Sequence, residues 1–167
     1  QFIKKHADYI MDTSHMLVRE LKQEIDKIFL ENEEYQNFFI TILSFGFKYG
    51  IPADCDLVFD VRFLPNPYYI PELKKKTGND FEVYDYVMKS EQAKEFDEKL
   101  FDMIKFLVPN YITEGKNQLV IGIGCTGGKH RSVSLANALA KHMQELPYSL
   151  KVEHRDIEKD AKTKGEN

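Results

Sequence analysis

One segment of the sequence indicates the fold, LVIGIGCTGGKHRS at residues 119–132. An apolar run from Leu119 to Ile121 precedes a glycine-rich stretch that starts at Gly122, and an amphipathic helix begins near Ser132. A short apolar run bounded by glycine is typical of a buried strand, and glycine lets backbone N–H groups turn toward a ligand. The segment therefore predicts a strand, a loop and a helix start that together cradle an anion.

The residue types in this loop favour phosphate as the anion. Backbone N–H groups at a helix start carry partial positive charge, and Lys129, His130 and Arg131 add side-chain donors. A tight turn around a buried cysteine is the alternative interpretation. The candidate binding residues of the loop are Cys125, Thr126, Gly127, Gly128, Lys129, His130, Arg131 and Ser132.

Two known phosphate loops resemble this segment in part. A Walker A loop needs Gly, four residues and Gly-Lys-Ser/Thr, but Ile123 and His130 occupy two of the required positions, so the segment is not a nucleotide loop of that type. The spacing from Cys125 to Arg131 matches the Cys-x5-Arg-Ser/Thr loop of protein tyrosine phosphatases, in which the Cys is a thiolate nucleophile. Gly124 stands where those enzymes usually carry His. A cysteine-dependent phosphatase is therefore an alternative function.

Composition is that of an ordinary globular domain. The 167 residues are 43% apolar and 30% charged, which suits one domain with a continuous core. No apolar run reaches membrane-span length, and residues 1–12 are too polar for a secretory signal. Two cysteines, Cys55 and Cys125, fit a reducing cytoplasm and suggest no metal site. A net charge of −4 gives no global attraction to nucleic acid.

Apolar periodicity predicts strands that alternate with helices. We expect strands at 38–47, 57–59, 118–123 and 150–156, the second of them buried, and helices at 17–29, at 96–107 and from 132 to Pro147. The second helix is expected to stop before Pro109, and residues 65–80 to form a long irregular excursion. These elements predict an α/β fold with a largely parallel sheet flanked by helices, as a single ligand-binding domain at 14–156 with a flexible tail at 157–167.

Ligands of such sheets lie beyond the carboxyl ends of the strands. Asp60 and Arg62 follow one expected strand, so we expect them to line the same crevice as the loops at 46–50 and 126–131. A carboxylate beside a phosphate cradle suits a phosphorylated sugar that also carries hydroxyls or an amine. A local ion pair is the alternative role for Asp60 and Arg62, and Tyr68 either closes over a ligand or only packs.

Four motifs, in the same order, resemble the C-terminal domain of the RapZ/YvcJ family. They are SFGFKYGIP at 44–52, DVRFLPNP at 60–67, GCTGGKHRS at 124–132 and HRD at 154–156. The resemblance implies a cytoplasmic bacterial protein whose C-terminal domain is similar in architecture to part of a phosphofructokinase. It also implies an N-terminal P-loop domain, absent here, that binds and slowly hydrolyses ATP or GTP, with residues 1–13 as a linker from it and no cofactor in this domain.

The resemblance also implies a ligand and partners. In enterobacterial members this domain senses glucosamine-6-phosphate and helps present a small regulatory RNA to a ribonuclease. Asp60, Thr126, Gly127 and Arg131 fall on motif positions associated with amino-sugar phosphate binding, and Tyr68 stands where enterobacterial members have His. We therefore expect a non-catalytic metabolite sensor that forms a homo-oligomer, does not enter a membrane and signals to the nucleotide-binding half or to a protein partner. An RNA-binding adapter is a further alternative, although residues 151–167 hold five basic and five acidic residues.

Overall fold

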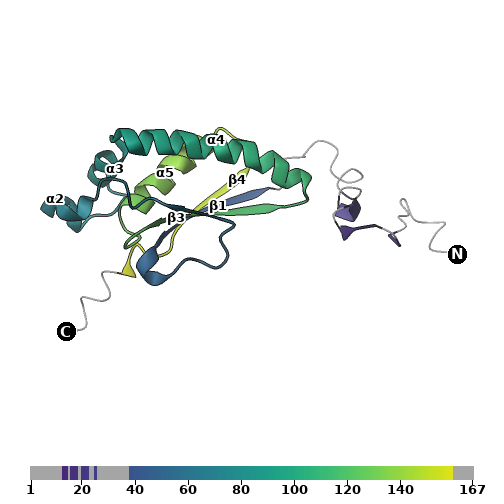
Figure 1. The fold of residues 1–167 in the computed structure, drawn as a ribbon, viewed down its shortest axis with the longest axis horizontal. Coiled ribbons are helices and arrows are strands. Elements are labelled where there is room, and N and C mark those ends of the chain that lie inside the picture. Colours follow the sequence, from purple (N-terminus) through teal and green to yellow (C-terminus); the bar gives the residue numbers. More distant parts are fainter. Residues whose placement is uncertain (1–12, 15, 19, 23–24, 26–37, 160–167) are drawn as a thin grey trace.

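One parallel sheet organises the chain (Figure 1). The computed structural model describes residues 13–14, 16–18, 20–22, 25 and 38–159. The strands β1 (Phe39–Gly46), β2 (Leu57–Asp60), β3 (Gln118–Cys125) and β4 (Ser149–His154) pair in the order β2-β3-β1-β4, all parallel. The predicted α/β fold is confirmed.

The two ends of the chain fall largely outside this description. In the expected helix at 17–29, residues 18, 20–22 and 25 are helical, and the rest of it lies outside the described residues. Nearly all of the expected linker at 1–13 and most of the tail at 157–167 also lie outside them. The domain boundaries therefore stay predictions.

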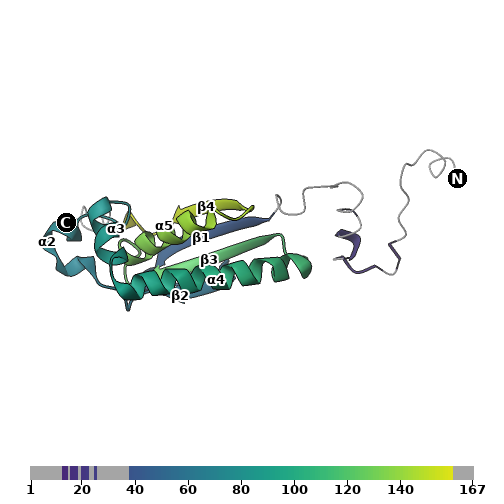
Figure 2. The same cartoon turned by 90° about the horizontal axis from the view of Figure 1, so that it is seen from above.

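Two long helices cover one face of the sheet. These are α4 (Glu91–Thr113) and α5 (Arg131–Met143), whereas residues 47–56, which include the 3-10 helix η2 (Phe47–Tyr49), cross the other face (Figures 1 and 2). Helix α4 connects β2 to β3, and helix α5 connects β3 to β4, so both connections cross the sheet in the same direction. The connection from β1 to β2 crosses it in the opposite direction. Right-handed crossovers that run in opposite directions must lie on opposite faces, which explains this arrangement.

The strands bury large side chains under the helices. The main core includes Ile40, Ile42, Ile104, Leu119, Ile121, Ile123, Leu135 and Leu139, all at most 1% exposed. Their spacing follows the period of two along β1 and β3 and the helical period along α4 and α5. The apolar positions that predicted these elements therefore also form the core.

Gly122 and Gly124 lie within β3, whereas the strand expected at 118–123 included Gly122 but left Gly124 to the loop. A Cβ atom at Gly122 would lie 2.7 Å from Cys55 Sγ, and one at Gly124 would lie 2.6 Å from ring atoms of Phe45 and Phe47. Both glycines thus make room for side chains on the face opposite the helices. The strand runs on to Cys125, and the loop proper spans residues 126–130.

Two further expectations were wrong, and one helix was missed. Strand β2 lies at the sheet edge, so Leu57 and Phe59 are only partly buried and Val58 is 40% exposed, where a buried strand was expected. The excursion at 65–80 contains η3 (Pro67–Tyr69) and α2 (Pro71–Lys74), because prolines suit the first turn of a helix. Helix α3 (Phe81–Met88) then follows and had not been predicted.

Helix α4 continues through Pro109, although the sequence predicted that it would stop before this residue. Pro109 is exposed, so solvent can reach the carbonyl that it leaves without a helical donor. Nearby side chains also bond the backbone, since Asn110 Nδ2 donates to the Phe106 carbonyl at 2.7 Å and Thr113 Oγ1 to the Pro109 carbonyl at 3.0 Å. Helix α5 ends at Met143, ahead of Pro147.

Candidate functional site

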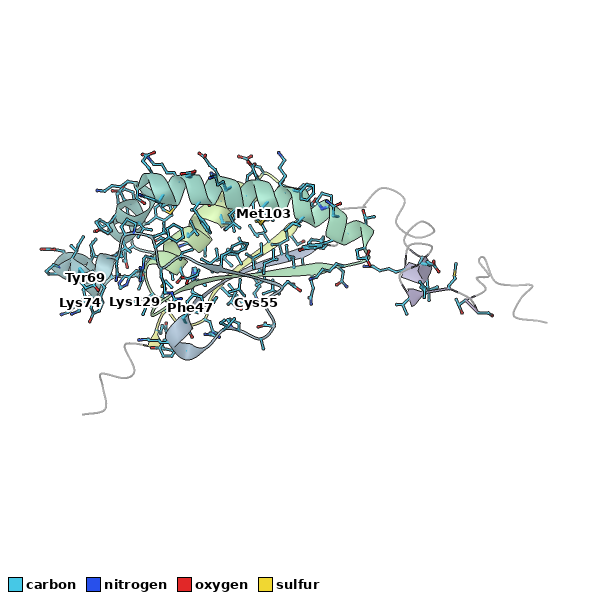
Figure 3. All side chains as sticks on the ribbon, viewed as in Figure 1. Phe47, Cys55, Tyr69, Lys74, Met103 and Lys129 are labelled. Atoms are coloured by element: carbon cyan, nitrogen blue, oxygen red, sulfur yellow. The ribbon has the colours of Figure 1, made fainter. Side chains whose placement is uncertain are left out.

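The carboxyl ends of the strands bring all four sequence motifs together. In the sheet register Gly46 is opposite Cys125, and Asp60 is opposite Gly124. The Lys48 N–H donates to the carbonyl of Thr126 at 3.3 Å. The segments that follow β1, β2 and β3 therefore lie close together at one edge of the sheet, where Figure 3 labels Phe47 and Lys129.

Glycines let the loop at 126–130 pack directly against backbone. A Cβ atom at Gly46 would lie 2.6 Å from the Gly127 carbonyl carbon, so the two backbone segments are in contact with no side chain between them. Gly128 has a φ of 72°, the left-handed conformation that glycine adopts without strain. The loop therefore folds back across the end of β1.

Several backbone N–H groups of the loop have no acceptor. Among the described residues, nothing accepts a hydrogen bond from the N–H groups of Gly127, Lys129 and His130. Helix α5 begins immediately afterwards at Arg131, with no side chain capping its first turn. Free N–H groups at a helix start attract anions through both hydrogen bonding and the helix dipole. The loop can therefore bind a phosphate-sized anion.

Arg131 connects the loop to the segment after β2. Its side chain is buried, with 6% of the residue exposed. Nη1 donates to the carbonyls of Arg62 at 2.5 Å and Leu64 at 3.3 Å, and Nη2 donates to Thr126 Oγ1 at 3.2 Å. The guanidinium thus fixes the Asp60 segment against the loop.

Asp60 and Arg62 form a partly exposed ion pair. Arg62 Nη2 lies 2.6 Å from Asp60 Oδ2, and Arg62 Nε and its N–H also donate to the carboxylate. The Arg62 guanidinium stacks 4.4 Å from the centroid of the Phe47 ring. The hydrogen bond from the Arg62 side chain holds the pKa of Asp60 below its ordinary value. The structure therefore shows the local ion pair that the sequence allowed as an alternative, with both groups still open to solvent at the site.

Cys125 is buried at the end of β3, with 3% of the residue exposed. Its Sγ accepts a hydrogen bond from the Gly128 N–H at 3.3 Å and lies 3.1 Å from Ser132 Oγ. A nucleophile must reach the phosphorus atom, and this thiol is covered by its own loop. The geometry favours a role in holding the loop.

The basic side chains of the loop turn toward backbone carbonyls. Lys129 Nζ donates to the Lys75 carbonyl at 3.1 Å. His130 is only 8% exposed, and burial, together with the positive charge of Lys129, lowers its pKa. Both effects favour the neutral imidazole of His130. Tyr68 lies on η3, is 50% exposed, and has Lys74 Nζ 4.4 Å from its ring centroid.

Asp156 supports the site, a role that the sequence did not reveal. The carboxylate accepts the Gly46 N–H at 2.8 Å and pairs with Arg155 and Lys159, each at 2.7 Å. Burial alone would raise the pKa of Asp156, but hydrogen bonds from Arg155, the Gly46 N–H and Lys159 outweigh it and lower the pKa. The HRD motif contains this residue, yet only the fold shows what it binds.

Gly78 packs against the start of α5 and was also missed. A Cβ atom there would lie 2.5 Å from the His130 carbonyl oxygen, and the Gly78 N–H donates to the Lys129 carbonyl at 2.9 Å.

Within the part of the chain that is described, no group of three His, Cys, Asp or Glu side chains is placed to hold a metal ion. Each helix in that part is too short or too polar to cross a lipid bilayer.

Comparison with known proteins relates the chain to one family. The family model described as the RapZ C-terminal domain matches residues 38–158. A protein of Lachnoclostridium phytofermentans named nucleotide-binding protein is 67% identical over 159 residues, which are 95% of this chain and 56% of the relative. One of the same name from Agathobacter rectalis is 68% identical over 162 residues, 96% of this chain and 56% of the relative. The chain thus spans about half the length of the curated relatives it matches.

Proposed function

The chain belongs to the RapZ C-terminal domain family, and from that premise we propose that it is a regulatory domain that binds a phosphorylated amino sugar, such as glucosamine-6-phosphate. The observation that carries the proposal is the set of acceptor-free N–H groups at Gly127, Lys129 and His130, which lie among the described residues at the start of α5. A phosphate group bound there would accept hydrogen bonds from these N–H groups, which have no acceptor in the described part of the protein.

The segment after β2 supplies the sugar-binding side of the proposed site. Arg131 fixes this segment against the loop, and the Asp60 carboxylate is 44% exposed. An ionised carboxylate has room for more hydrogen bonds than the Arg62 pair uses, so it can also accept from an ammonium or hydroxyl of the sugar. Asp60 would then distinguish an amino sugar phosphate from its hydroxyl analogue.

For the whole protein we propose a division of labour. The relatives are named nucleotide-binding proteins and are longer than this chain, so ATP or GTP binding would belong to their other half. Occupancy of the sugar phosphate site would be passed to that half or to a protein partner, in a cytoplasmic homo-oligomer. RNA binding is supported less, because Lys76 pairs with Glu82 at 2.5 Å within the main basic run.

Isothermal titration with glucosamine-6-phosphate, glucose-6-phosphate and inorganic phosphate tests the proposal. We expect saturable binding that favours the amino sugar, and Asp60→Asn should remove that preference while phosphate binding persists. Asp102→Asn, an exposed carboxylate on α4, is the matched control. Absence of binding to all three compounds, or an unchanged preference in Asp60→Asn, would rule out this assignment.

A further inference from the structure

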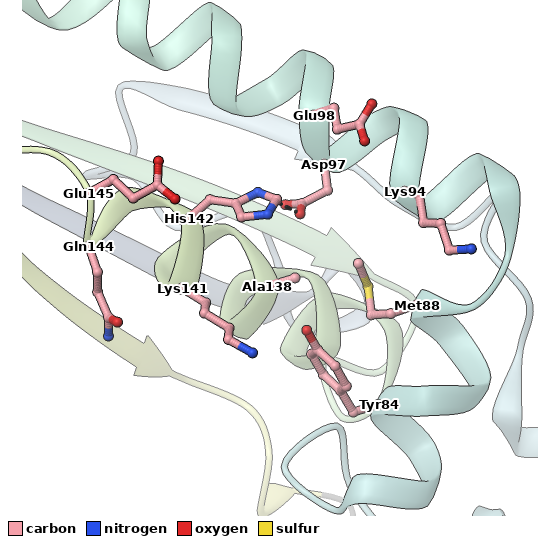
Figure 4. Close-up of a pocket in the computed structure, with 10 residues that line it drawn as sticks. All are labelled: Tyr84, Met88, Lys94, Asp97, Glu98, Ala138, Lys141, His142, Gln144 and Glu145. Atoms are coloured by element: carbon pink, nitrogen blue, oxygen red, sulfur yellow. Dashed lines mark ion pairs between the residues drawn. The ribbon is translucent and has the colours of Figure 1, made fainter.

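A pocket lies between α3, α4 and α5, among residues that the proposed anion site does not use (Figure 4). Its volume is about 620 Å³, within the range of roughly 300–1,000 Å³ that is typical of small-molecule sites. Tyr84 and Met88 line it from α3, Asp97 from α4, and Ala138 and Lys141 from α5. Three helices thus meet around a polar space with an apolar wall.

Asp97 is the unusual residue of this pocket. It is 4% exposed, and its Oδ2 lies 3.0 Å from His142 Nδ1. Asp97 Oδ1 and His142 Nδ1 are both buried with no hydrogen-bond partner among the described residues. Burial raises the pKa of Asp97 to about 6, against the opposing charge of His142. Buried carboxylate oxygens almost always have a donor, so an unpartnered one in a pocket indicates that a donor is missing.

Two further unpartnered donors lie in the same pocket, on Lys141 and Tyr84. In the described part of the chain, neither the Lys141 ammonium nor the Tyr84 hydroxyl has an ion pair or a hydrogen bond. In the view of Figure 4 they lie together on one side of Ala138, with Asp97 on the other. The pocket therefore presents an acceptor and a pair of donors separated by an apolar side chain.

This pattern discriminates between ligand classes. A simple cation would meet Lys94 and Lys141, and a simple anion would meet Asp97 and Glu98. Repulsion inside a partly desolvated pocket disfavours both. A zwitterion instead offers an ammonium to the carboxylate and a carboxylate to the donors.

We propose that this pocket binds a free amino acid with an apolar side chain. The α-ammonium pairs with the Asp97 carboxylate, the α-carboxylate accepts hydrogen bonds from Lys141 Nζ and Tyr84 Oη, and the side chain packs on Met88 and Ala138. The site is separate from the anion site, since α5 has Arg131 at its first residue and Lys141 near its last. A sugar phosphate therefore does not compete with the amino acid.

Saturation-transfer NMR on the 167-residue chain with L-leucine and L-methionine tests the proposal, with N-acetyl-L-leucine and L-leucinamide as analogues that lack one charge each. We expect a Kd of about 1 mM or tighter for the free amino acids, no binding of either analogue, and no displacement by glucosamine-6-phosphate. Lys141→Gln and Asp97→Asn should each weaken binding by about tenfold or more. Lys105→Gln, an exposed lysine on α4, should leave it unchanged.

Other results would overturn the proposal. Failure of every amino acid to bind would do so, as would binding that both pocket variants leave unaltered. Equal binding of L-leucinamide would show a cation site instead of a zwitterion site. Lys141 is exposed and unpaired among the described residues, so its variant should fold even if the Asp97 variant does not.

Discussion

Arg131 and Arg62 are joined by a hydrogen bond in which the buried guanidinium of one binds the backbone carbonyl of the other at 2.5 Å. The two cations can lie next to each other because the Asp60 carboxylate neutralises Arg62. Arg131 is held by hydrogen bonds to backbone carbonyls, including that of Leu64. Arg131 therefore joins the segment after β2 to the loop after β3.

We expect Arg131→Lys to weaken both stability and ligand binding. A single ammonium cannot replace the planar fork that reaches Arg62, Leu64 and Thr126. The free energy of unfolding should fall by about 1–3 kcal/mol, and affinity for glucosamine-6-phosphate should fall by more than about tenfold. Urea unfolding and calorimetric titration measure the two effects, with Lys105→Arg as control. A variant equal to the parent in both would show that the fork has no role.

Gly46→Ala should destabilise the loop by about 1–3 kcal/mol, since the added methyl meets backbone of Gly127 at 2.6 Å. Gly50→Ala is the informative comparison. Gly50 has open space around it but a φ of 85°, so alanine there costs only backbone strain of about 1 kcal/mol. Thermal unfolding of both variants separates the effects, and a smaller loss in Gly46→Ala than in Gly50→Ala would contradict the close approach seen here.

Asp156→Asn should lower stability at neutral pH by about 2–3 kcal/mol, because the charged partners Arg155 and Lys159 lose their carboxylate. The pKa of Asp156 is lowered in the folded chain, so its contribution is complete above the unfolded value of about 3.9 and is lost as pH falls through the folded pKa. The gap between parent and variant should therefore close in strong acid. Urea unfolding between pH 7 and pH 2 tests this, and a gap that does not narrow would argue against it.

The sheet and the edge at which the motifs gather were predictable from sequence for one physical reason. Buried strands need apolar runs, and parallel strands end at one edge, so the segment after β2 and the loop after β3 lie close together. The role of Gly122 and Gly124 was not predictable, because their neighbours Phe45, Phe47 and Cys55 come from distant parts of the chain. The composition of a loop does not reveal which glycines belong to the strand before it.

Side-chain partners were less predictable than elements. The partners of Arg131 within the protein were not predicted, because its donors reach carbonyls at Arg62 and Leu64 that only the fold brings near. The pocket at Asp97 gave no motif at all, since its residues are spread over three helices, one of which was not predicted. Short amphipathic helices such as α3 depend on tertiary packing more than on their own propensity.

Pro109→Ala should stabilise the chain by about 1–3 kcal/mol, because α4 already runs through this position and alanine restores a helical donor. Asn110→Ala is the comparison, and it should destabilise, since it removes the hydrogen bond to the Phe106 carbonyl. The midpoint of urea unfolding reports both. A Pro109→Ala variant less stable than the parent would mean that the proline ring contributes packing that outweighs the missing donor.

Asp97 should make stability depend on pH in the direction opposite to Asp156. Its pKa is raised to about 6 in the folded chain, so between about pH 4 and pH 6 the folded state holds a proton that the unfolded state has released. Stability attributable to Asp97 therefore falls as pH rises through this window, by a few kcal/mol at most. The groups that face Asp97 are His142, Glu98, Tyr84, Lys94 and Lys141.

We expect Asp97→Asn to remove this decline in stability. The difference in unfolding free energy between variant and parent should therefore shift in favour of the variant from pH 4 to pH 7. Glu98→Gln, exposed on the same helix, should change little. A constant difference across the range would show that Asp97 is ionised throughout and that the pocket already compensates its charge.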